Sequence, residues 1–324
     1  MKKVSIIMPT YKRAQIIKKS IKSVLNQTYT DFELIIVDDG SGDGTSEVVE
    51  SLSDKRIKFY ELEENKGACY ARNYAIDKAT GDYFAFLDSD NVWNKKYLEK
   101  RIAHLEKQPE NVGGVFGNVK LHKKGERSYI FPVDFPQYEV QHEDGNDSLI
   151  KYMLFNNAID TNSIVLKSDC LHCAEGFNNE LRRLQDWEFF FRIVVESGYK
   201  IAYINDLLVN DYIQKDSITN GINNDAYWNS RVYILQHYKD VYEQKNCKYE
   251  AIADMIFMID PYCKDEDIDK LIDGLSSDEL SVLIKTIKKR QYKFKLYKPL
   301  SQRIREYYSR VIYKRLTILF DKYN

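Results

Sequence analysis

The sequence predicts an α/β fold in which a mostly parallel sheet has helices on both faces. Apolar runs that lack the alternation of a half-buried strand occur at 4–8, 32–39, 57–62 and 83–87. Segments with helical spacing of apolar residues separate these runs, at 14–27, 44–53 and 67–79. Strands that are apolar on both faces and alternate with helices are typical of parallel sheets covered on both sides.

The first strand, 4–8, reads VSIIM and is followed directly by Pro9. Apolar residues then recur every three or four positions in 14–27, which predicts an amphipathic helix. The second strand, 32–39, reads FELIIVDD and closes on two aspartates. Both strands are short and rich in β-branched residues, which favours an extended backbone.

The helix expected at 44–53 begins beside Thr45, the predicted N-cap. The third strand reads IKFYEL, and the helix after it, 67–79, ends near Gly81. The fourth strand reads YFAFL and runs directly into the residues DSDN. These elements complete the alternation from which the fold class is inferred.

The region from about 113 to 215 is mixed. Short strands are expected in VGGVFGNVKL, RSYIFP, TNSIVLK, KIAYIN and LLVNDYI, and a helix is expected at 184–197, which opens at Asp186 and stops at Gly198. From about residue 222 on, the predicted elements are helices, in AYWNSRVYILQHYKDVYEQ, DEDIDKLIDGL, SDELSVLIKTIKKR and QRIREYYSRVIYKRLTILF. The chain therefore divides into an α/β domain at 1–220 and a helical region at 221–324.

The composition excludes several classes of protein. No apolar run reaches the ~18 residues of a spanning helix, and the run Val4–Met8 is too short for a secretory signal. Five cysteines show no disulfide framework, so a cytoplasmic location is expected. The sequence CLHC at 170–173 lacks matched ligands elsewhere for tetrahedral zinc, and we interpret it as structural.

Charge is unevenly spread along the chain. The net charge is −1, yet residues 281–324 hold 13 Lys and Arg against 2 Asp and Glu. In this tail basic residues alternate with Tyr, Leu, Ile and Phe, a pattern typical of helices on anionic membrane surfaces. The alternative is a helix that packs on the α/β domain or on a second subunit, as in a homodimer. Since no nucleic-acid module is present, nucleic acid is not expected as a partner.

Three strand ends carry unusual polar residues: PTYKR after the first strand, DDGSGDGT after the second and DSDN after the fourth. In parallel sheets ligands bind at the carboxyl ends of the strands, so one site can collect all three. The second segment is not a dinucleotide fingerprint, because Thr45 stands where the third glycine would be. Taken singly, it also fits a plain turn, and Tyr11 of the first segment fits an ordinary surface side chain.

Asp88 and Asp90 are the strongest candidates for a metal site. Two carboxylates one residue apart can approach a single Mg²⁺ or Mn²⁺, which prefers oxygen ligands and completes its shell with substrate phosphates. The alternative is a pair of solvated aspartates that caps the following helix. Asp186, at a helix start, can stay ionised and act as a general base, or it can be a simple N-cap.

Taken together and in order, four segments resemble the family 2 glycosyltransferases, which have the GT-A fold: VSIIMPTYKR, SVLNQTYTDFELIIVDDGSGDGT, NKGACYARNYAIDKATGDYFAFLDSDNVW and LQDWEFFFRI. The resemblance covers roughly residues 3–215. It implies an inverting enzyme that moves a sugar from a nucleotide-diphosphate donor, preferably a UDP-sugar, to an acceptor hydroxyl. Bacterial members often use polyprenyl-diphosphate-linked acceptors, which implies a lipid-linked or growing surface glycan and a position at the inner membrane surface.

The resemblance also implies residue roles. Tyr11 would stack on the nucleobase, Asp39 would bind the base with Asp38 nearby, and Arg72 would lie close to the phosphates. Asp90 would bind the metal directly, and Asp88 would contact the ribose or a metal-bound water. The donor-binding set implied in this way is Pro9, Thr10, Tyr11, Arg13, Asp38, Asp39, Arg72, Asp88 and Ser89. The nucleotide-binding half would be about 1–92 and the acceptor half about 93–220.

The implied base is Asp186, although Gln185 stands where the family commonly has Glu. That departure leaves an alternative open: a non-catalytic, nucleotide-sugar-binding or scaffold protein on the same fold. A sugar-nucleotide pyrophosphorylase, on a related fold, usually has a glycine-rich loop after the first strand, and PTYKR has no glycine.

Overall fold

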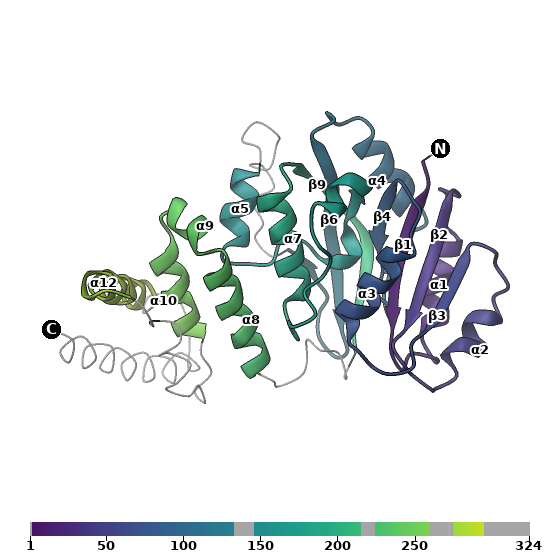
Figure 1. The fold of residues 1–324 in the computed structure, drawn as a ribbon, viewed down its shortest axis with the longest axis horizontal. Helices are drawn as coiled ribbons and strands as arrows, with labels where there is room; N and C mark the ends of the chain where they lie inside the picture. Colours follow the sequence, from purple (N-terminus) through teal and green to yellow (C-terminus); the bar gives the residue numbers. More distant parts are fainter. Residues whose placement is uncertain (1, 133–145, 215–223, 259–271, 273–274, 295–324) are drawn as a thin grey trace. The chain divides into compact units, whose positions relative to one another are not determined.

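The computed structural model describes residues 2–132, 146–214, 224–258, 272 and 275–294. The chain divides into two compact units, Met1–Ile222 and Asn223–Asn324 (Figure 1). Each unit is described by itself.

The first half of the sheet follows the predicted alternation. Strands β1 (Val4–Thr10), β2 (Phe32–Asp38), β3 (Ile57–Glu61) and β4 (Tyr83–Phe86) are parallel and lie in the order β3-β2-β1-β4. Helices α1 (Ile17–Leu25), α2 (Thr45–Glu50) and α3 (Ala68–Asp77) connect them in turn. The predicted elements are confirmed, except that Gly44, with φ 84°, takes the N-cap position expected of Thr45.

The second half of the sheet is mixed. β8 (Val165–Lys167) pairs antiparallel with β4, and the order continues through β6 (Val112–Lys123) and β9 (Lys200–Ile213) to β5 (Val92–Trp93). β7 (Tyr129–Phe131) pairs with β6. The segments KIAYIN and LLVNDYI, predicted as two short strands, form the single strand β9. Its register against β6 shifts near Asn118, which accommodates the polar residues between the two apolar segments.

The described residues of the first unit also form α4 (Tyr97–Leu105), α5 (Asp147–Met153), the 3₁₀ turn η1 (Thr161–Ser163), α6 (Ser168–His172) and α7 (Gln185–Glu196). The predicted helix at 184–197 is confirmed as α7. The segment TNSIVLK, predicted to be a strand throughout, begins instead with η1, because the Asp160 side chain accepts a hydrogen bond from the backbone N–H of Asn162.

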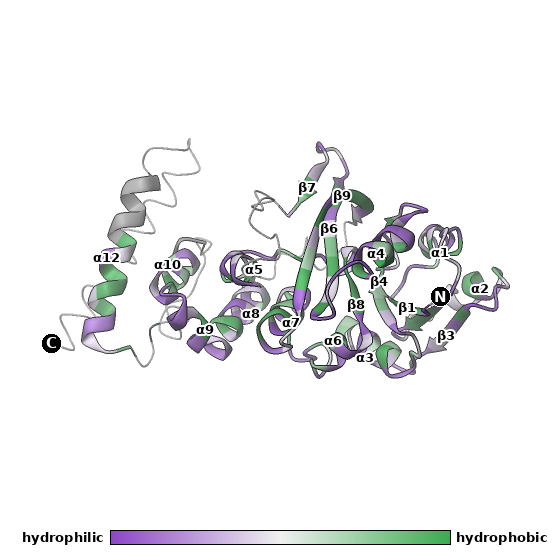
Figure 2. Ribbon diagram, turned by 90° about the horizontal axis from the view of Figure 1, so that it is seen from above, coloured by the Kyte–Doolittle hydropathy of each residue, from purple (hydrophilic) through white to green (hydrophobic). Residues whose placement is uncertain are grey.

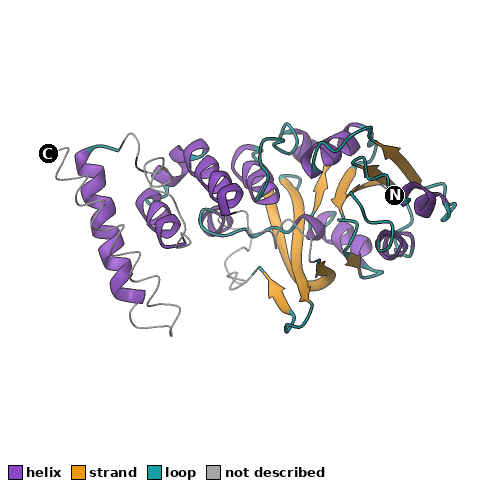
Figure 3. Ribbon diagram, turned by 90° about the horizontal axis from the view of Figure 1, so that it is seen from below, coloured by secondary structure: helices purple, strands orange, loops and turns teal. Residues whose placement is uncertain are grey.

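The sheet lies between two layers of helices (Figure 3). On one face, Ile6 and Met8 of β1 join a buried cluster with residues of α1 and α4, whereas Ile7 is buried on the other face. Helices such as α1 and α4 carry both apolar and polar residues, as the mixed colours in Figure 2 show. Burial on both faces explains why the strand sequences are apolar without alternation.

The second unit is helical where it is described. Its helices are α8 (Asn224–His237), α9 (Lys239–Gln244), α10 (Lys248–Met258) and α12 (Ser277–Phe294). The segment AYWNSRVYILQHYKDVYEQ, predicted as one helix, breaks at Tyr238. Glu279 in the first turn of α12 accepts bonds from Lys248 Nζ at 3.0 Å and Tyr249 Oη at 3.1 Å, which join α12 to α10.

Two sequence predictions fall outside this description. Nearly all of DEDIDKLIDGL and the basic tail beyond residue 294 lie outside the described residues. Within the part of the chain that is described, no helix has both the length and the apolar content to cross a membrane.

Candidate active site

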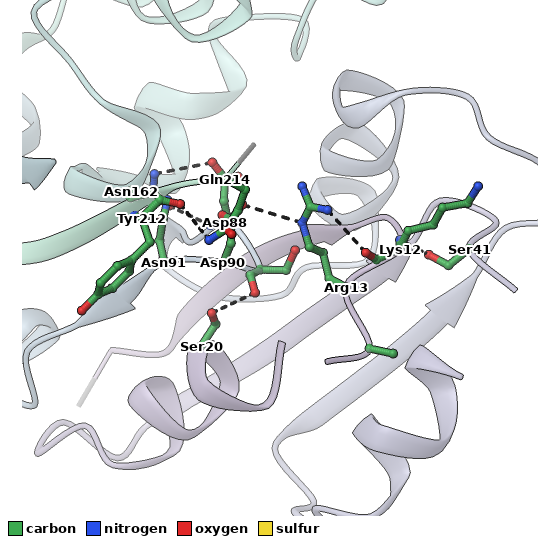
Figure 4. Close-up of polar contacts among 12 residues, drawn as sticks. Lys12, Arg13, Ser20, Ser41, Asp88, Asp90, Asn91, Asn162, Tyr212 and Gln214 are labelled. Atoms are coloured by element: carbon green, nitrogen blue, oxygen red, sulfur yellow. Dashed lines mark hydrogen bonds and ion pairs between the residues drawn. The ribbon is translucent and has the colours of Figure 1, made fainter. Parts of the chain in front are cut away.

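The turn after β4 is anchored through its backbone. The Asp88 N–H donates to Asn162 Oδ1 at 2.7 Å, and the Asn91 N–H donates back to the Asp88 carbonyl at 3.1 Å. Ser20 Oγ of α1 donates to the Ser89 carbonyl at 2.9 Å (Figure 4). A backbone N–H of β9 donates to the Asn91 side chain at 2.9 Å. These bonds hold the turn in place while the carboxylates of its aspartates remain available for other contacts.

Asp88 is joined to two distant motifs by one arginine. Arg72 Nη2 of α3 lies 2.7 Å from Asp88 Oδ1, and Nη1 lies 3.5 Å from Gln185 Oε1 at the start of α7. The Arg72 side chain is buried, and within the described structure its Nε has no partner. The motifs ARN, DSD and QDW therefore converge, as the family resemblance implies, and within the described structure one buried N–H of Arg72 still lacks an acceptor.

Asp90 faces the segment after β1. Its Oδ2 lies 3.7 Å from Nε of Arg13, and both side chains are largely buried. Lys12 between Tyr11 and Arg13 has a φ of 53°, a left-handed backbone that a non-glycine residue adopts at some cost. This conformation occurs where the chain turns from β1 toward the DSDN turn, and it places Arg13 beside Asp90.

The two aspartates after β2 have separate partners. Ser41 Oγ donates to the Asp38 carboxylate and accepts the Lys12 N–H at 2.7 Å. Burial raises the pKa of Asp38, and the Ser41 hydrogen bond opposes that rise. Both Asp39 carboxylate oxygens accept backbone N–H groups of the loop before α3, from Lys66 at 2.7 Å and Gly67 at 2.8 Å. Asp39 thus fixes that loop through its carboxylate.

The residues at the end of β1 differ in exposure. Pro9 and Thr10 are buried in the sheet, and the Thr10 carbonyl accepts the Asp39 N–H at 2.9 Å. Thr10 Oγ1 is buried, and the described structure offers it no hydrogen-bond partner. Tyr11 is 39% exposed. An open aromatic ring beside a buried, unpaired hydroxyl is compatible with a ligand at this strand end.

Asp186 lies in the first turn of α7, where it is not the N-cap, because Leu184 occupies that position. Its Oδ2 accepts a hydrogen bond from Asn157 Nδ2 at 2.8 Å. Burial raises the pKa of the Asp186 carboxyl, while the Trp187 N–H, Asn157 and the Arg72 charge act against that rise. The alternative of simple N-capping is therefore wrong in this structure.

Sequence reasoning missed two further aspartates, Asp160 before η1 and Asp211 of β9. Burial, with the Asp186 and Asp88 charges adding to it, raises the pKa of Asp160 to about 7 against the opposing Asn162 bonds. Burial and the charges of Asp160, Asp88 and Asp90 raise the pKa of Asp211 to about 8. Neither residue stands in a motif, and only the pairing of β8 and β9 with the rest of the sheet brings them to this site.

The donor set fits a hard divalent cation in its chemistry. The site gathers five aspartates, Asp88, Asp90, Asp160, Asp186 and Asp211, and burial, with the charges of neighbouring aspartates adding to it, raises the pKa of the last three. Carboxylates are the ligands that Mg²⁺ and Mn²⁺ prefer. Among the described residues, however, no three acidic, His or Cys side chains form a ready cage, so substrate oxygens or water would have to complete the shell.

The sequence CLHC is not assembled as a metal site among the described residues. Burial raises the pKa of the Cys170 thiol to about 12, which disfavours the thiolate that zinc requires. Cys173 is exposed and donates to the Asp169 carbonyl at 3.2 Å.

Comparison with known proteins identifies relatives of the chain. Residues 5–167 match the family described as glycosyl transferase family 2. The UDP-Glc:alpha-D-GlcNAc-diphosphoundecaprenol beta-1,3-glucosyltransferase WfgD of Escherichia coli is 45% identical over 118 residues, 36% of this chain and 46% of WfgD. The putative colanic acid biosynthesis glycosyl transferase WcaA of Escherichia coli K12 is 30% identical over 254 residues, 77% of this chain and 86% of WcaA. The match to WfgD thus spans less than half the length of that protein.

Two solved structures share the fold. TarS residues 1–349 of S. aureus, in complex with UDP, superposes with a TM-score of 0.60 at 20% identity and covers 89% of this chain and 82% of its own. The mannosyltransferase PcManGT of Pyrobaculum calidifontis, in complex with GDP-Man and Mn²⁺, has a TM-score of 0.56 at 18% identity, with 98% and 86% covered. The family match and the extent of the likeness to WcaA together show that the chain belongs to the family 2 glycosyltransferases, with the GT-A fold that its sheet displays.

Proposed function

We propose that the chain transfers a sugar from a nucleoside-diphosphate donor, preferably a UDP-sugar, to a hydroxyl of a lipid-linked or growing glycan, with inversion at the anomeric carbon. The observation that carries this proposal is the bridge made by Arg72. This guanidinium contacts Asp88 at 2.7 Å and Gln185 at 3.5 Å, and so links the turn after β4 to the start of α7, where Asp186 lies. One buried cation would thereby join the proposed donor site to the proposed base.

The donor would lie along the carboxyl ends of β1, β2 and β4. Tyr11 is open to stack on a base, and Thr10 Oγ1 and Arg72 Nε are buried donors without partners in the described structure. Asp38 and Asp39 would contact the nucleoside. The backbone of Ser89, which Ser20 holds in place, would line the donor site. Arg13 would move away from Asp90 when the donor binds and would then face the diphosphate.

Asp90, assisted by Asp88, would hold Mn²⁺ or Mg²⁺, which supplies neutralisation of the charge on the departing diphosphate. Asp186 would take the proton of the acceptor hydroxyl as the acceptor oxygen forms its bond to the anomeric carbon. The bond from that carbon to the diphosphate breaks, so the products are the glycosylated acceptor, the nucleoside diphosphate and one proton. A single displacement inverts the carbon without a covalent glycosyl-enzyme.

The donor and acceptor classes draw support from the relatives. The name of WfgD specifies UDP-Glc as donor and a diphosphoundecaprenol-linked acceptor, and the TarS structure contains UDP. For this chain, both the UDP-sugar and the polyprenyl-diphosphate acceptor are proposals. The nucleotide-binding and acceptor halves at about 1–92 and 93–220, the separate role of 221–324 and a homodimer also stay predictions.

The scaffold alternative rests on Gln185 in place of Glu. In the structure its amide oxygen accepts from Arg72 and its amide nitrogen donates to the Leu181 carbonyl at 2.8 Å. A glutamine in these contacts keeps the arginine near Asp88, so it gives no specific reason to prefer a protein without catalytic activity.

The assigned base can be tested by substituting Asp186. Asp186→Asn preserves shape and the contact with Asn157, but it cannot take a proton. We expect release of nucleoside diphosphate in the presence of acceptor to fall by at least about a hundredfold, while UDP-sugar binding stays within twofold. Glu180→Gln, an exposed acid in the segment before α7, is the matched control. A turnover rate for Asp186→Asn equal to that of the wild type would remove Asp186 as the base.

A further inference from the structure

We propose that Asn162 is a positioning residue whose side chain sets the geometry of the Asp88–Asp90 turn, and thereby the affinity for a nucleoside diphosphate bound with a divalent cation. This inference rests on the proposed function and deepens it. Asn162 lies in η1, which sequence reasoning took for part of an ordinary strand.

The sheet register explains why Asn162 meets Asp88. β4 and β8 pair antiparallel, with Ala85 opposite Val165. Continuing this register for three more residues brings Asp88 opposite Asn162, at the point where β8 has given way to η1. The ladder cannot supply a backbone acceptor there, and the Asn162 side-chain oxygen accepts the Asp88 N–H at 2.7 Å instead.

The side-chain amide nitrogen of Asn162 also contacts the carboxylates of Asp160 and Asp88. Its Nδ2 donates to Asp160 Oδ1 at 2.9 Å and lies 3.5 Å from Asp88 Oδ2. The side chain is 2% exposed. This position needs an acceptor for the Asp88 N–H and a donor for two carboxylates, and an asparagine amide provides both.

The backbone around Asn162 is held by three buried side chains spaced four residues apart. Trp93 Nε1 donates to the Asn162 carbonyl at 2.8 Å. Tyr97 Oη donates to the Ile164 carbonyl at 3.2 Å, and Arg101 Nε donates to the Ser163 carbonyl at 3.2 Å. Three consecutive carbonyls are therefore fixed from β5 and α4, which makes η1 a rigid support for the turn.

Removal of the Asn162 amide leaves the Asp88 N–H without its partner and takes one side-chain donor from each of the carboxylates of Asp88 and Asp160. The turn would then relax, and the ligand atoms of Asp88 and Asp90 would no longer be held at one spacing. Residues that orient metal ligands in this way typically change affinity by about 10–100-fold when they are replaced.

The test compares equilibrium binding of UDP in the presence of Mn²⁺, measured by calorimetry. We expect Asn162→Ala to bind UDP about tenfold more weakly than the wild type. The matched control is Asn146→Ala. The Asn146 amide also bridges backbone groups, donating to the carbonyls of Val194 at 3.0 Å and Tyr199 at 2.7 Å, but its contacts include no carboxylate of the site. The control should bind UDP within twofold of the wild type.

A second variant covers the case in which Asn162→Ala does not fold. Trp93→Phe removes the N–H that holds the Asn162 carbonyl, together with part of the buried indole, and keeps an aromatic ring over Tyr97. It should weaken UDP binding with Mn²⁺ by about threefold, the value of one hydrogen bond.

The inference would be overturned if Asn162→Ala bound UDP as tightly as the wild type. If that variant does not fold, unchanged affinity in Trp93→Phe would overturn it. A loss of affinity in Asn146→Ala equal to that in Asn162→Ala would also overturn it. If the wild type binds no UDP with Mn²⁺, the proposed function is wrong, and the inference, which rests on it, is wrong as well. Because that failure occurs in the wild-type arm, it is distinguished from a failure of the inference alone.

Discussion

At the scale of single residues, the properties of Asp186 follow from its surroundings. Burial raises the pKa of its carboxyl, and the N–H donors of Trp187 and Asn157 limit that rise by stabilising the ionised form. If Asp186 is the base, as we propose, its carboxyl must be ionised when it takes the acceptor proton. Its neighbours would then decide, together with its burial, the lowest pH at which the reaction proceeds.

A pH profile tests this dependence. Asn157 Nδ2 donates to Asp186 at 2.8 Å and favours the carboxylate, so Asn157→Ala should raise the pKa of Asp186 further. The rate should then begin to fall at a pH about one unit higher on the acid side, with the alkaline side unchanged. Asn156→Ala, an exposed neighbour, should leave the profile in place. A profile for Asn157→Ala that overlays the wild type would show that the contact does not tune the base.

At the scale of elements, one buried carboxylate ties the parallel strands together. Glu33 of β2 is 3% exposed and accepts from Lys58 Nζ of β3 at 2.6 Å, Ser5 Oγ of β1 at 2.7 Å and the Thr80 N–H at 2.8 Å. Burial by itself raises the pKa of Glu33, but the bonds from Lys58, Lys3, Ser5 and Thr80 outweigh it and lower the pKa to about 2. The strands that carry the site are thus fixed at their amino ends.

Stability against urea at several pH values tests this role. Because the folded-state pKa of about 2 lies below the ordinary value of 4.5, the stabilisation is complete above pH 4.5 and is lost as the pH falls through about 2. Glu33→Gln should lower the free energy of unfolding at pH 7 by about 2 kcal/mol, with a smaller difference near pH 3. Glu50→Gln, exposed on α2, should change it little. A difference for Glu33→Gln that does not shrink toward acid pH would contradict the account.

The elements also differ in how well the sequence predicts them. Strands β1 to β4 and their helices are predictable, because each buries a continuous apolar segment and ends at turn residues. η1 is not, because Asp160 and Asn162 replace a strand start by a local hydrogen bond that no periodicity reveals. Asp160 and Asp211 were missed for a related reason: they reach the site through antiparallel and crossover pairing, which depends on the register of the whole sheet.

At the scale of the whole molecule, the family match and the site overlap only in part. The match covers residues 5–167, whereas Asp186 and Asp211 lie beyond it. From the residues alone, the DSDN motif predicts Asp88 and Asp90 as metal ligands and the helix start predicts Asp186 as a base, whereas Arg72 enters only through the family resemblance. The excess of basic residues after 281 belongs to a different part of the chain, and its contact with an anionic membrane surface stays a prediction from charge and from the interleaved apolar residues.

Removal of the basic tail tests the proposed membrane contact. The full chain should sediment with vesicles that contain anionic phosphatidylglycerol, because each basic residue near such a surface contributes about 1 kcal/mol. A chain that ends at residue 289 should stay in the supernatant and bind UDP as before. Vesicles of neutral phosphatidylcholine provide the control. Equal sedimentation of the shortened chain with anionic vesicles would assign the tail to packing against protein.

The most direct measurement of the central claim is the affinity for UDP with Mn²⁺ and with EDTA, for the wild type and for Asp90→Asn. If the DSDN turn binds a dication together with a diphosphate, UDP should bind the wild type at least about tenfold more tightly with Mn²⁺ than with EDTA, and Asp90→Asn should lose that gain. Equal affinity of the wild type in both conditions, or a full Mn²⁺ gain in Asp90→Asn, would contradict it.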